Sequence, residues 1–521
     1  MGAARRAALS AALAVAIGGA GSAAPEGHWP RLKPPSPAAR GRTVESLPGA
    51  VLEHHGGPTR AGLYRDPSLT RAAAARLRLD RGFQARLSGA VYAQPLYLPA
   101  SGGRPALVIA ASERNEVAAF DAGTGATRWR RTLGAPVPRS RLPCGNIDPL
   151  GITGTPIADP ASRTLYLDAM TTPDGGATKR HLVFALSLDD GATRPGWPLD
   201  VAELARRRGL AFDAAVQNQR GALALRRGQL YVPFGGHYGD CGDYHGWVFA
   251  IPVKDPLAGT AWRSEARGGG VWAPGGLSAD GDHLFASTGN TFDARSWGGG
   301  DAVLRFDAGA PLGSRPADWF APSDWKELDD RDADLGGTVP LPIELPGASP
   351  TKLVTALGKD GKLYLLDRDR LGGTDGPLAA IEVADGPIVG AAAAYSTARG
   401  SYLAFRARGR RCPGGRAGDL VAVRLRPGAP PSAEVAWCAR VEGKGSPMAT
   451  TTGDGGEVIV WTVGAEGDER LHGFDGDTGA VIHGGGGREE ALRAVRRFQS
   501  PVLGGGRIYV GVDGGVQAFA R

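Results

Sequence analysis

The sequence has few cysteines and no long apolar run, and each shortage argues against a class of protein. Four cysteines occur among 521 residues, and none stands in a CxxC or CxxCH spacing. Covalent haem attachment and a structural zinc site are therefore not predicted. No segment reaches 18 apolar residues, so no membrane-spanning helix is predicted either.

Charge of one sign is also scarce. The formal net charge is +7, and the basic residues are scattered without any run of five like charges. A nucleic-acid-binding surface is therefore not predicted, and a solvated surface of mixed sign is the simpler interpretation.

Glycine and proline, by contrast, are abundant. The 81 glycines and 39 prolines make up about 23% of the chain, against roughly 12% in average proteins. Hydrophobic residues still supply 42% and charged residues 22%, and no Gly-X-Y period occurs, so neither a disordered nor a collagen-like chain is indicated. This composition is typical of a folded protein with many short strands and tight turns.

The first 24 residues are typical of an export signal. Arg5 and Arg6 precede an alanine-rich apolar stretch, and small residues follow up to Ala24. The alternative is a short helix of the mature fold. Because no cysteine lies near this segment, a lipid anchor is not predicted, and we expect a periplasmic or secreted protein. Residues 25–82 then predict a Pro- and Arg-rich arm that ends in a short helix over 67–79.

From residue 83 the chain repeats one unit eight times. Each unit contains an apolar strand that leads into a turn, and a further strand stands 10–20 residues before it. These apolar strands are Val117–Asp121, Leu182–Leu186, Trp247–Ile251, Val303–Asp307, Leu363–Asp367, Leu420–Val423, Leu471–Asp475 and Val516–Phe519. With an innermost strand added, each unit has about four short antiparallel strands, which predicts an all-β, eight-bladed β-propeller over 83–521. A seven-bladed ring with one irregular unit, and a pair of domains, are the alternatives.

The last unit ends at Arg521 after its third strand. Residues 82–87 stand before the first unit and belong to no blade of their own. We therefore expect this segment to supply the missing strand of the last blade, because such closure removes an exposed sheet edge.

A repeat signature connects these units with a known family. Residues 119–129 match the pattern AxDxxTGxxxW, and residues 475–479 match it in part, with His483 in place of the tryptophan. This pattern resembles the PQQ-like, or quinoprotein, β-propeller repeat family. Residues 91–97, 151–156, 244–248 and 358–364 resemble an exported subgroup of such propellers. The resemblance implies the fold but not one function, because the repeat occurs in PQQ-dependent dehydrogenases and in non-catalytic outer-membrane assembly scaffolds.

The resemblance leaves a cofactor open. In the alcohol-dehydrogenase class, PQQ stacks on a ring formed by two adjacent bonded cysteines, and no two cysteines are adjacent here. A calcium-assisted aspartate base is not identified by any motif. The glucose-dehydrogenase class lacks the cysteine pair, so PQQ and calcium remain possible.

Long loops between second and third strands favour one face of the ring for binding. They cover residues 171–180, 235–245, 289–301 and 407–418; neutral drift of loops is the alternative. All four cysteines fall on this face, and their positions predict the bridges Cys144–Cys241 and Cys412–Cys438.

Nine polar or aromatic residues are candidates for the central funnel on that face. They are Gln94, Thr153, Gln219, Arg220, Trp272, Asp334, Lys359, Lys444 and Gln499. Two lysines, an arginine and a tryptophan suit a planar anion such as PQQ or a sugar acid. The simpler interpretation is that these side chains bond one another or water.

The loop over 235–245 is the densest polar cluster. His237, Asp240, Asp243 and His245 are weak candidates for metal binding. Because their spacing is not diagnostic, we favour the interpretation that they are hydrogen-bonded loop residues around a disulfide.

Together these features predict an exported, monomeric quinoprotein-like propeller that binds a small molecule or an envelope protein as a binding or scaffold module. A PQQ- and calcium-dependent dehydrogenase of sugars or alcohols is the alternative. A carbohydrate-active propeller comes third, and a serine hydrolase has no GxSxG motif to support it.

Overall fold

The computed structural model describes residues 47–521 except 314 and 416. The predicted signal segment, residues 1–24, and the arm up to residue 46 lie outside the described residues. The chain divides into two units, residues 1–41 and 42–521, and the account below concerns the second. No helix among the described residues is long and apolar enough to span a bilayer.

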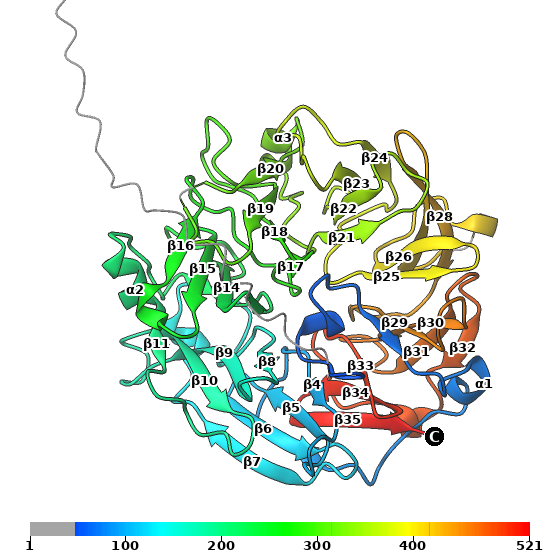
Figure 1. Ribbon diagram of the computed structural model, residues 1–521, viewed down its shortest axis with the longest axis horizontal. Coiled ribbons are helices and arrows are strands. Elements are labelled where there is room, and N and C mark those ends of the chain that lie inside the picture. Colours follow the sequence, from blue (N-terminus) through cyan, green and yellow to red (C-terminus); the bar gives the residue numbers. More distant parts are fainter. Residues whose placement is uncertain (1–46, 314, 416) are drawn as a thin grey trace, which may run out of the picture. The chain divides into compact units, whose positions relative to one another are not determined.

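Eight sheets of antiparallel strands form a ring, which confirms the eight-bladed propeller (Figure 1). Blades 1 and 2 contain β4(Leu96–Leu98), β5(Leu107–Ala111), β6(Glu116–Asp121), β7(Thr127–Thr132), β8(Ile157–Asp159), β9(Thr164–Thr171), β10(Arg180–Ser187) and β11(Leu199–Asp200). Blades 3 and 4 contain β12(Gln217–Asn218), β13(Ala224–Arg226), β14(Gln229–Gly236), β15(Trp247–Pro252), β16(Thr260–Arg263), β17(Ser278–Ala279), β18(His283–Ser287), β19(Val303–Asp307) and β20(Asp318–Phe320). Each predicted repeat therefore corresponds to one sheet.

The second half of the ring continues the same order. Blades 5 and 6 contain β21(Leu341–Glu344), β22(Lys352–Leu357), β23(Lys362–Asp367), β24(Ala379–Glu382), β25(Ala393–Thr397), β26(Gly400–Arg406), β27(Leu420–Arg426) and β28(Ser432–Ala439). Blades 7 and 8 contain β29(Met448–Thr451), β30(Val458–Val463), β31(Leu471–Asp475), β32(Val481–Gly484), β33(Val502–Gly504), β34(Arg507–Val512) and β35(Gly515–Ala520).

The repeat signature has a direct structural cause in blade 1. Oδ1 of Asp121 accepts hydrogen bonds from the backbone N–H of Thr124 and from its hydroxyl, both at 3.1 Å, which holds the turn after β6. Trp129 on β7 is buried, and its Nε1 donates to the backbone oxygen of Leu188 in blade 2 at 2.9 Å. A Cβ on Gly191 would lie 2.6 Å from that indole, so this position in the turn of blade 2 requires glycine. The signature therefore joins neighbouring blades.

The ring closes as predicted. β3(Ala85–Arg86) pairs antiparallel with β35 and supplies the outer strand that the last blade lacks. β2(Arg78–Leu79) pairs with the same strand, so the closure is longer than the predicted segment. The short helix predicted over 67–79 is present as α1(Arg71–Ala74), which Thr70 caps through its side-chain oxygen. Two more helices, α2(Val201–Arg207) and α3(Trp325–Asp330), lie in connections between strands.

The described end of the arm is folded into the ring. Residues 51–65, which we call the plug, include β1(Leu63–Arg65), and this strand pairs parallel with β29, the first strand of blade 7. Backbone hydrogen bonds also join the plug to the first strands of blades 1, 2, 4 and 6, at Tyr97, Ala158, Ala279 and Ala394. Figure 1 shows this blue segment among the first strands. The chain itself therefore fills part of the propeller's centre.

A buried arginine anchors the plug. The Arg60 side chain is fully buried, and it donates to the backbone oxygens of Leu223 and Leu277 at 2.8 Å. The same guanidinium donates to the Glu53 carboxylate at 2.8 Å, and Arg226 of blade 3 donates to that carboxylate at the same distance. Because a buried charge is tolerated only when it is paired and hydrogen-bonded, this network holds the plug in one position.

Candidate functional site

A polar cavity with an empty volume of ≈ 450 Å³ lies beside the plug, and we call it the funnel cavity. It is lined by His54, Tyr92, Gln94, Asn146, Thr153, Thr155, Arg220, Pro274, Arg497 and Phe498. Except for His54, these residues belong to segments that lead into or lie near the first strands of blades 1, 2, 3, 4 and 8. Five different blades and the plug thus converge on one cavity.

Arg220 supplies the free positive charge of this cavity. Its guanidinium lies over the Phe498 ring, with the central carbon 6.0 Å from the ring centroid. Among the described residues, no carboxylate lies within ion-pair distance of it, whereas Arg497 pairs with Glu466 at 2.8 Å. Burial lowers the pKa of Arg220, but a guanidinium stays charged in proteins. The cavity therefore presents a desolvated cation that lacks a counter-charge.

Glu113 lies behind the wall of the cavity and positions Thr153. Its carboxylate accepts a hydrogen bond from the Thr153 hydroxyl at 2.8 Å and another from the Gly151 backbone N–H at 2.7 Å. Burial raises the pKa of Glu113 to about 7, because a charged carboxylate loses its hydration there. Glu113 is therefore partly neutral at physiological pH and only partly offsets the charge of Arg220.

His54 brings the plug into the cavity. Its side chain is buried and stacks on His55, with ring centroids 4.4 Å apart and planes at 6°. Burial lowers the pKa of His54 well below its usual value, so the imidazole is neutral. Nδ1 of His54 has no hydrogen-bond partner among the described residues, although buried polar atoms usually have one. An unpartnered imidazole atom thus lies next to the cavity.

Three of the nine predicted funnel residues, Gln94, Thr153 and Arg220, line this cavity. Gln94 also holds the plug, because its Oε1 accepts a hydrogen bond from the His55 backbone N–H at 3.1 Å. The prediction missed His54, since the arm that carries it reads as a linker.

The other predicted funnel residues have protein partners of their own. Gln219 donates to the backbone oxygen of Gly221, and Gln499 donates to that of Val91 at 3.2 Å. Lys444 pairs with Glu466 at 3.2 Å, the carboxylate that also binds Arg497. These three residues therefore bond protein groups outside the predicted set, and not one another.

Trp272, Asp334 and Lys359 form a second group, between blades 4 and 5. The ammonium nitrogen of Lys359 lies 5.0 Å from the ring centroid of Trp272 and within 2.6 Å of carboxylate oxygens on both Asp332 and Asp334. Asp301 is buried nearby with neither carboxyl oxygen hydrogen-bonded among the described residues. Burial and neighbouring carboxylates raise the pKa of Asp301 to about 11, so it is protonated.

These residues do not fit the PQQ and calcium pair that the sequence left open. The described residues contain no group of three or more His, Cys, Asp or Glu side chains placed to hold a metal ion. The charge of Lys359 is already neutralised by two carboxylates. Backbone also crowds the indole of Trp272, since a Cβ on Gly336 would lie 2.5 Å from its Nε1. The aromatic ring of Trp272 is present, but the part of the chain that the structure describes places no group of metal-ligating side chains beside it.

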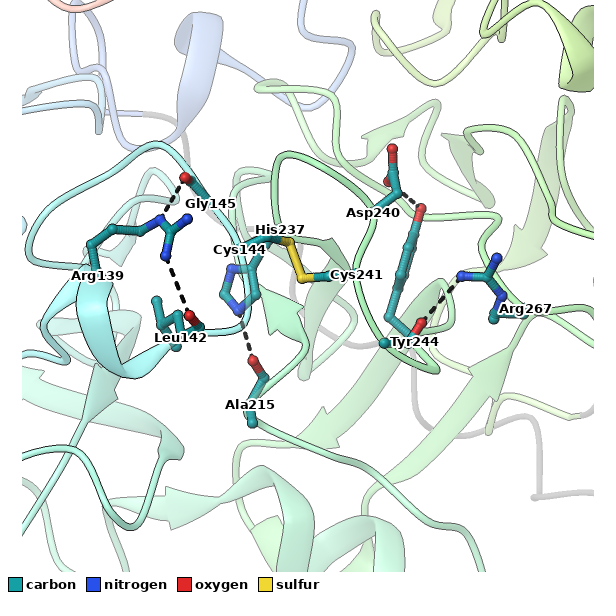
Figure 2. Close-up of a disulfide and its surroundings, with 11 residues drawn as sticks. Arg139, Leu142, Cys144, Gly145, Ala215, His237, Asp240, Cys241, Tyr244 and Arg267 are labelled. Carbon is teal, nitrogen blue, oxygen red and sulfur yellow. Dashed lines mark hydrogen bonds between the residues drawn. A yellow bond between two sulfur atoms is a disulfide. The ribbon is translucent and has the colours of Figure 1, made fainter.

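Both predicted disulfides are present. Cys144 bonds to Cys241 across 97 residues, and Cys412 bonds to Cys438 across 26. Figure 2 shows the first bridge between two loops. Structural disulfides form in oxidising compartments, so the pair fits a periplasmic or extracellular protein.

The four weak metal candidates lie in the loop that carries Cys241, where three of them have hydrogen-bond partners outside the set and Asp243 lies 3.9 Å from Nε2 of His245. His237 is hydrogen-bonded to the backbone oxygen of Ala215 at 3.0 Å, and Asp240 accepts the Tyr244 hydroxyl at 2.7 Å (Figure 2). Asp243 is exposed, and His245 is hydrogen-bonded to the backbone oxygen of Ser264 at 3.0 Å. The structure therefore supports the interpretation of hydrogen-bonded loop residues.

Comparisons with known proteins show the fold. No protein-family model and no curated protein matches the sequence. Among solved structures, a quinohemoprotein alcohol dehydrogenase from Pseudomonas putida HK5 is similar, with a TM-score of 0.62 and 14% identity over 91% of this chain and 80% of that chain. A europium-containing methanol dehydrogenase gives 0.60 and 15% over 91% of both chains. A quinohemoprotein alcohol dehydrogenase from Comamonas testosteroni gives 0.58 and 13% over 90% and 80%. The chain is thus an eight-bladed propeller with the fold of these quinoprotein dehydrogenases, as its repeat signature predicted.

Proposed function

We propose that the protein is an exported binding propeller whose funnel cavity holds a small organic anion, with the carboxylate of that anion bound by Arg220. The observation that carries the proposal is the guanidinium of Arg220, which faces the cavity without a carboxylate partner among the described residues. A guanidinium binds a carboxylate through two parallel hydrogen bonds, and this interaction is strong where water is excluded.

The rest of the cavity suits the remainder of such a ligand. Its walls supply the hydroxyls of Thr153 and Thr155 and the amides of Gln94 and Asn146, which bond polar substituents. A compact hydroxy acid or sugar acid matches this lining.

Isothermal titration calorimetry tests the proposal. The probes are glucuronate, citrate and succinate, with glucose and succinamide as uncharged counterparts. We expect at least one carboxylate to bind while its counterpart does not, and Arg220→Gln to weaken binding at least tenfold. Arg220→Lys keeps the charge but loses the planar fork, so it should retain part of the affinity. Arg206→Gln is the matched control, because Arg206 lies on the exposed surface of α2, where it pairs with Glu203.

Two results would contradict this function. One is that no probe binds, and the other is that Arg220→Gln binds the carboxylates as the unchanged protein does. PQQ with Ca²⁺ is added as a further probe, with dye reduction measured across sugars and alcohols. Dye reduction that requires PQQ would establish the dehydrogenase instead.

A further inference from the structure

A second cavity lies away from the funnel, at the outer strands of blades 3 and 4. It has an empty volume of ≈ 650 Å³, and we call it the Trp cleft. Its lining is Trp262, Arg263, Glu265, Trp297, Gly298, Gly299, Arg315, Pro316 and Trp319. Three of the 11 tryptophans in the chain thus line one cleft: Trp262 is buried beneath it, while Trp297 and Trp319 are partly exposed.

The three indoles are held in fixed orientations. Trp297 and Trp319 stack face to face, with ring centroids 3.7 Å apart and planes at 10°, so each indole covers one face of the other and holds it in place. Nε1 of Trp297 donates to the Gly300 backbone oxygen at 2.8 Å. Trp262 packs edge-to-face on Phe306 at 5.7 Å. A wall whose side chains are already ordered loses little conformational entropy when a ligand binds.

Two glycines of the lining pack their backbone closely against neighbouring residues. Gly299 has φ +98°, and a Cβ there would lie 3.3 Å from the Trp262 ring. A Cβ on Gly298 would lie 2.7 Å from that of Ala266. The absence of side chains at these two positions therefore lets the backbone pack closely against Trp262 and Ala266.

The charges around the cleft favour an anion. Arg263 has no carboxylate within ion-pair distance among residues 47–521 apart from 314 and 416, and its guanidinium lies 5.8 Å from the Trp247 ring centroid. Arg315 is exposed and is 4.0 Å from Glu265. Two guanidiniums and one carboxylate leave an excess of positive charge, and Arg263 is the cation that remains unneutralised.

We propose that the Trp cleft binds an acidic carbohydrate, with one sugar ring stacked on the tryptophans and its carboxylate bound by Arg263. A pyranose presents a flat face of C–H groups and a rim of hydroxyls, which matches aromatic walls edged by polar groups. The cleft has no leucine, isoleucine or valine in its lining, so an alkyl chain fits it less well. Its positive excess disfavours a cationic ligand. This site is independent of the funnel cavity.

Titration of tetragalacturonate tests this inference, with cellotetraose as the neutral counterpart. Binding is followed by calorimetry and by tryptophan fluorescence. The protein used carries Arg220→Gln, so that a carboxylate bound in the funnel does not contribute. We expect tetragalacturonate to bind with one site. Trp319→Ala should weaken it at least tenfold, and Arg263→Gln should abolish the preference over cellotetraose.

Trp272→Phe is the matched control, since this tryptophan lies in the second group near the funnel, and it should leave binding unchanged. Thermal unfolding of each variant shows whether it is folded. The inference is overturned if neither tetrasaccharide binds, if folded Trp319→Ala binds as before, or if Trp272→Phe removes the binding. Because the Arg220→Gln background disables the funnel, failure here leaves the proposed function of the funnel untouched.

Discussion

The plug offers the sharpest test of how the ring is held together. Arg60 on the plug is fully buried and connects Glu53 and the backbone oxygen of His54 with the backbone oxygens of Leu223 and Leu277. In Arg60→Met, the three backbone oxygens lose these donors, while Glu53 keeps its ion pair with Arg226. Removing one partner from a buried charged network costs about 3–5 kcal/mol. We therefore expect the free energy of unfolding to fall by that amount.

The shift in melting temperature follows from the size of the ring. A unit of roughly 480 residues has an unfolding entropy of about 1 kcal/mol/K, at about 2.1 cal/mol/K for each residue. A loss of about 3–5 kcal/mol then lowers Tm by about 3–5 °C. Differential scanning calorimetry measures this shift. Hydrogen–deuterium exchange of residues 51–65 shows whether the plug is released before the ring unfolds.

Arg65→Met is the matched control, because Arg65 is exposed on the same segment. A surface substitution of this kind changes stability by less than about 0.5 kcal/mol. The reasoning is refuted if Arg60→Met lowers the free energy of unfolding by less than about 1 kcal/mol while the plug amides stay as protected as in the unchanged protein.

Two further predictions concern Glu113 and the disulfides. Burial raises the pKa of Glu113 from 4.5 to about 7, because the folded protein favours the neutral carboxyl over the carboxylate. The stability that this neutral carboxyl contributes is therefore fully present below pH 4.5 and is lost as the pH rises through 7. Denaturant titrations should therefore show Glu113→Gln gaining stability relative to the unchanged protein between pH 5 and 8. A difference in the free energy of unfolding that stays constant over this range would contradict the raised pKa of Glu113. Loop-closure entropy predicts a loss of about 4–5 kcal/mol when serines replace Cys144 and Cys241, and of about 3–4 kcal/mol for Cys412 and Cys438. Chemical denaturation measures both losses, and the opposite order would refute the entropic account.

The blades were predictable because each repeat depends on local chemistry. The Asp121–Thr124 turn and Trp129 lie within nine residues of one another, and their contacts recur where Trp437 donates to the Gly476 backbone oxygen. Alternation of apolar residues indicates strands at any position in the ring. The same regularity predicted the closure, since a unit that lacks one strand must take it from the other end of the chain.

The plug was not predictable in this way. Its buried residues include His54, His55 and Arg60, and no apolar period marks them. They are buried because partners from several blades bond them, such as Ser500, whose hydroxyl lies 2.9 Å from Nε2 of His55. Such partners come together only when the ring has closed.

Only part of the candidate site was predictable, because its residues also depend on partners from several blades. Position near a first strand identified Gln94, Thr153 and Arg220, because the segments at the first strands of several blades meet at the funnel cavity. It also selected Lys444, which the neighbouring Glu466 neutralises. Which cation remains without a counter-charge depends on distances between blades, and no spacing along the chain contains them.

The sequence by itself determined the propeller, the number of its blades, its closure and the pairing of its cysteines. Each of these follows from local turn chemistry, from strand periodicity or from the face on which a loop emerges. The tertiary structure decided that the arm enters the ring, that Arg220 has a cavity before it, and that Trp262, Trp297 and Trp319 meet in a cleft. The physical reason is that burial and charge neutralisation depend on the three-dimensional neighbours of a group, and in a closed ring those neighbours come from distant blades.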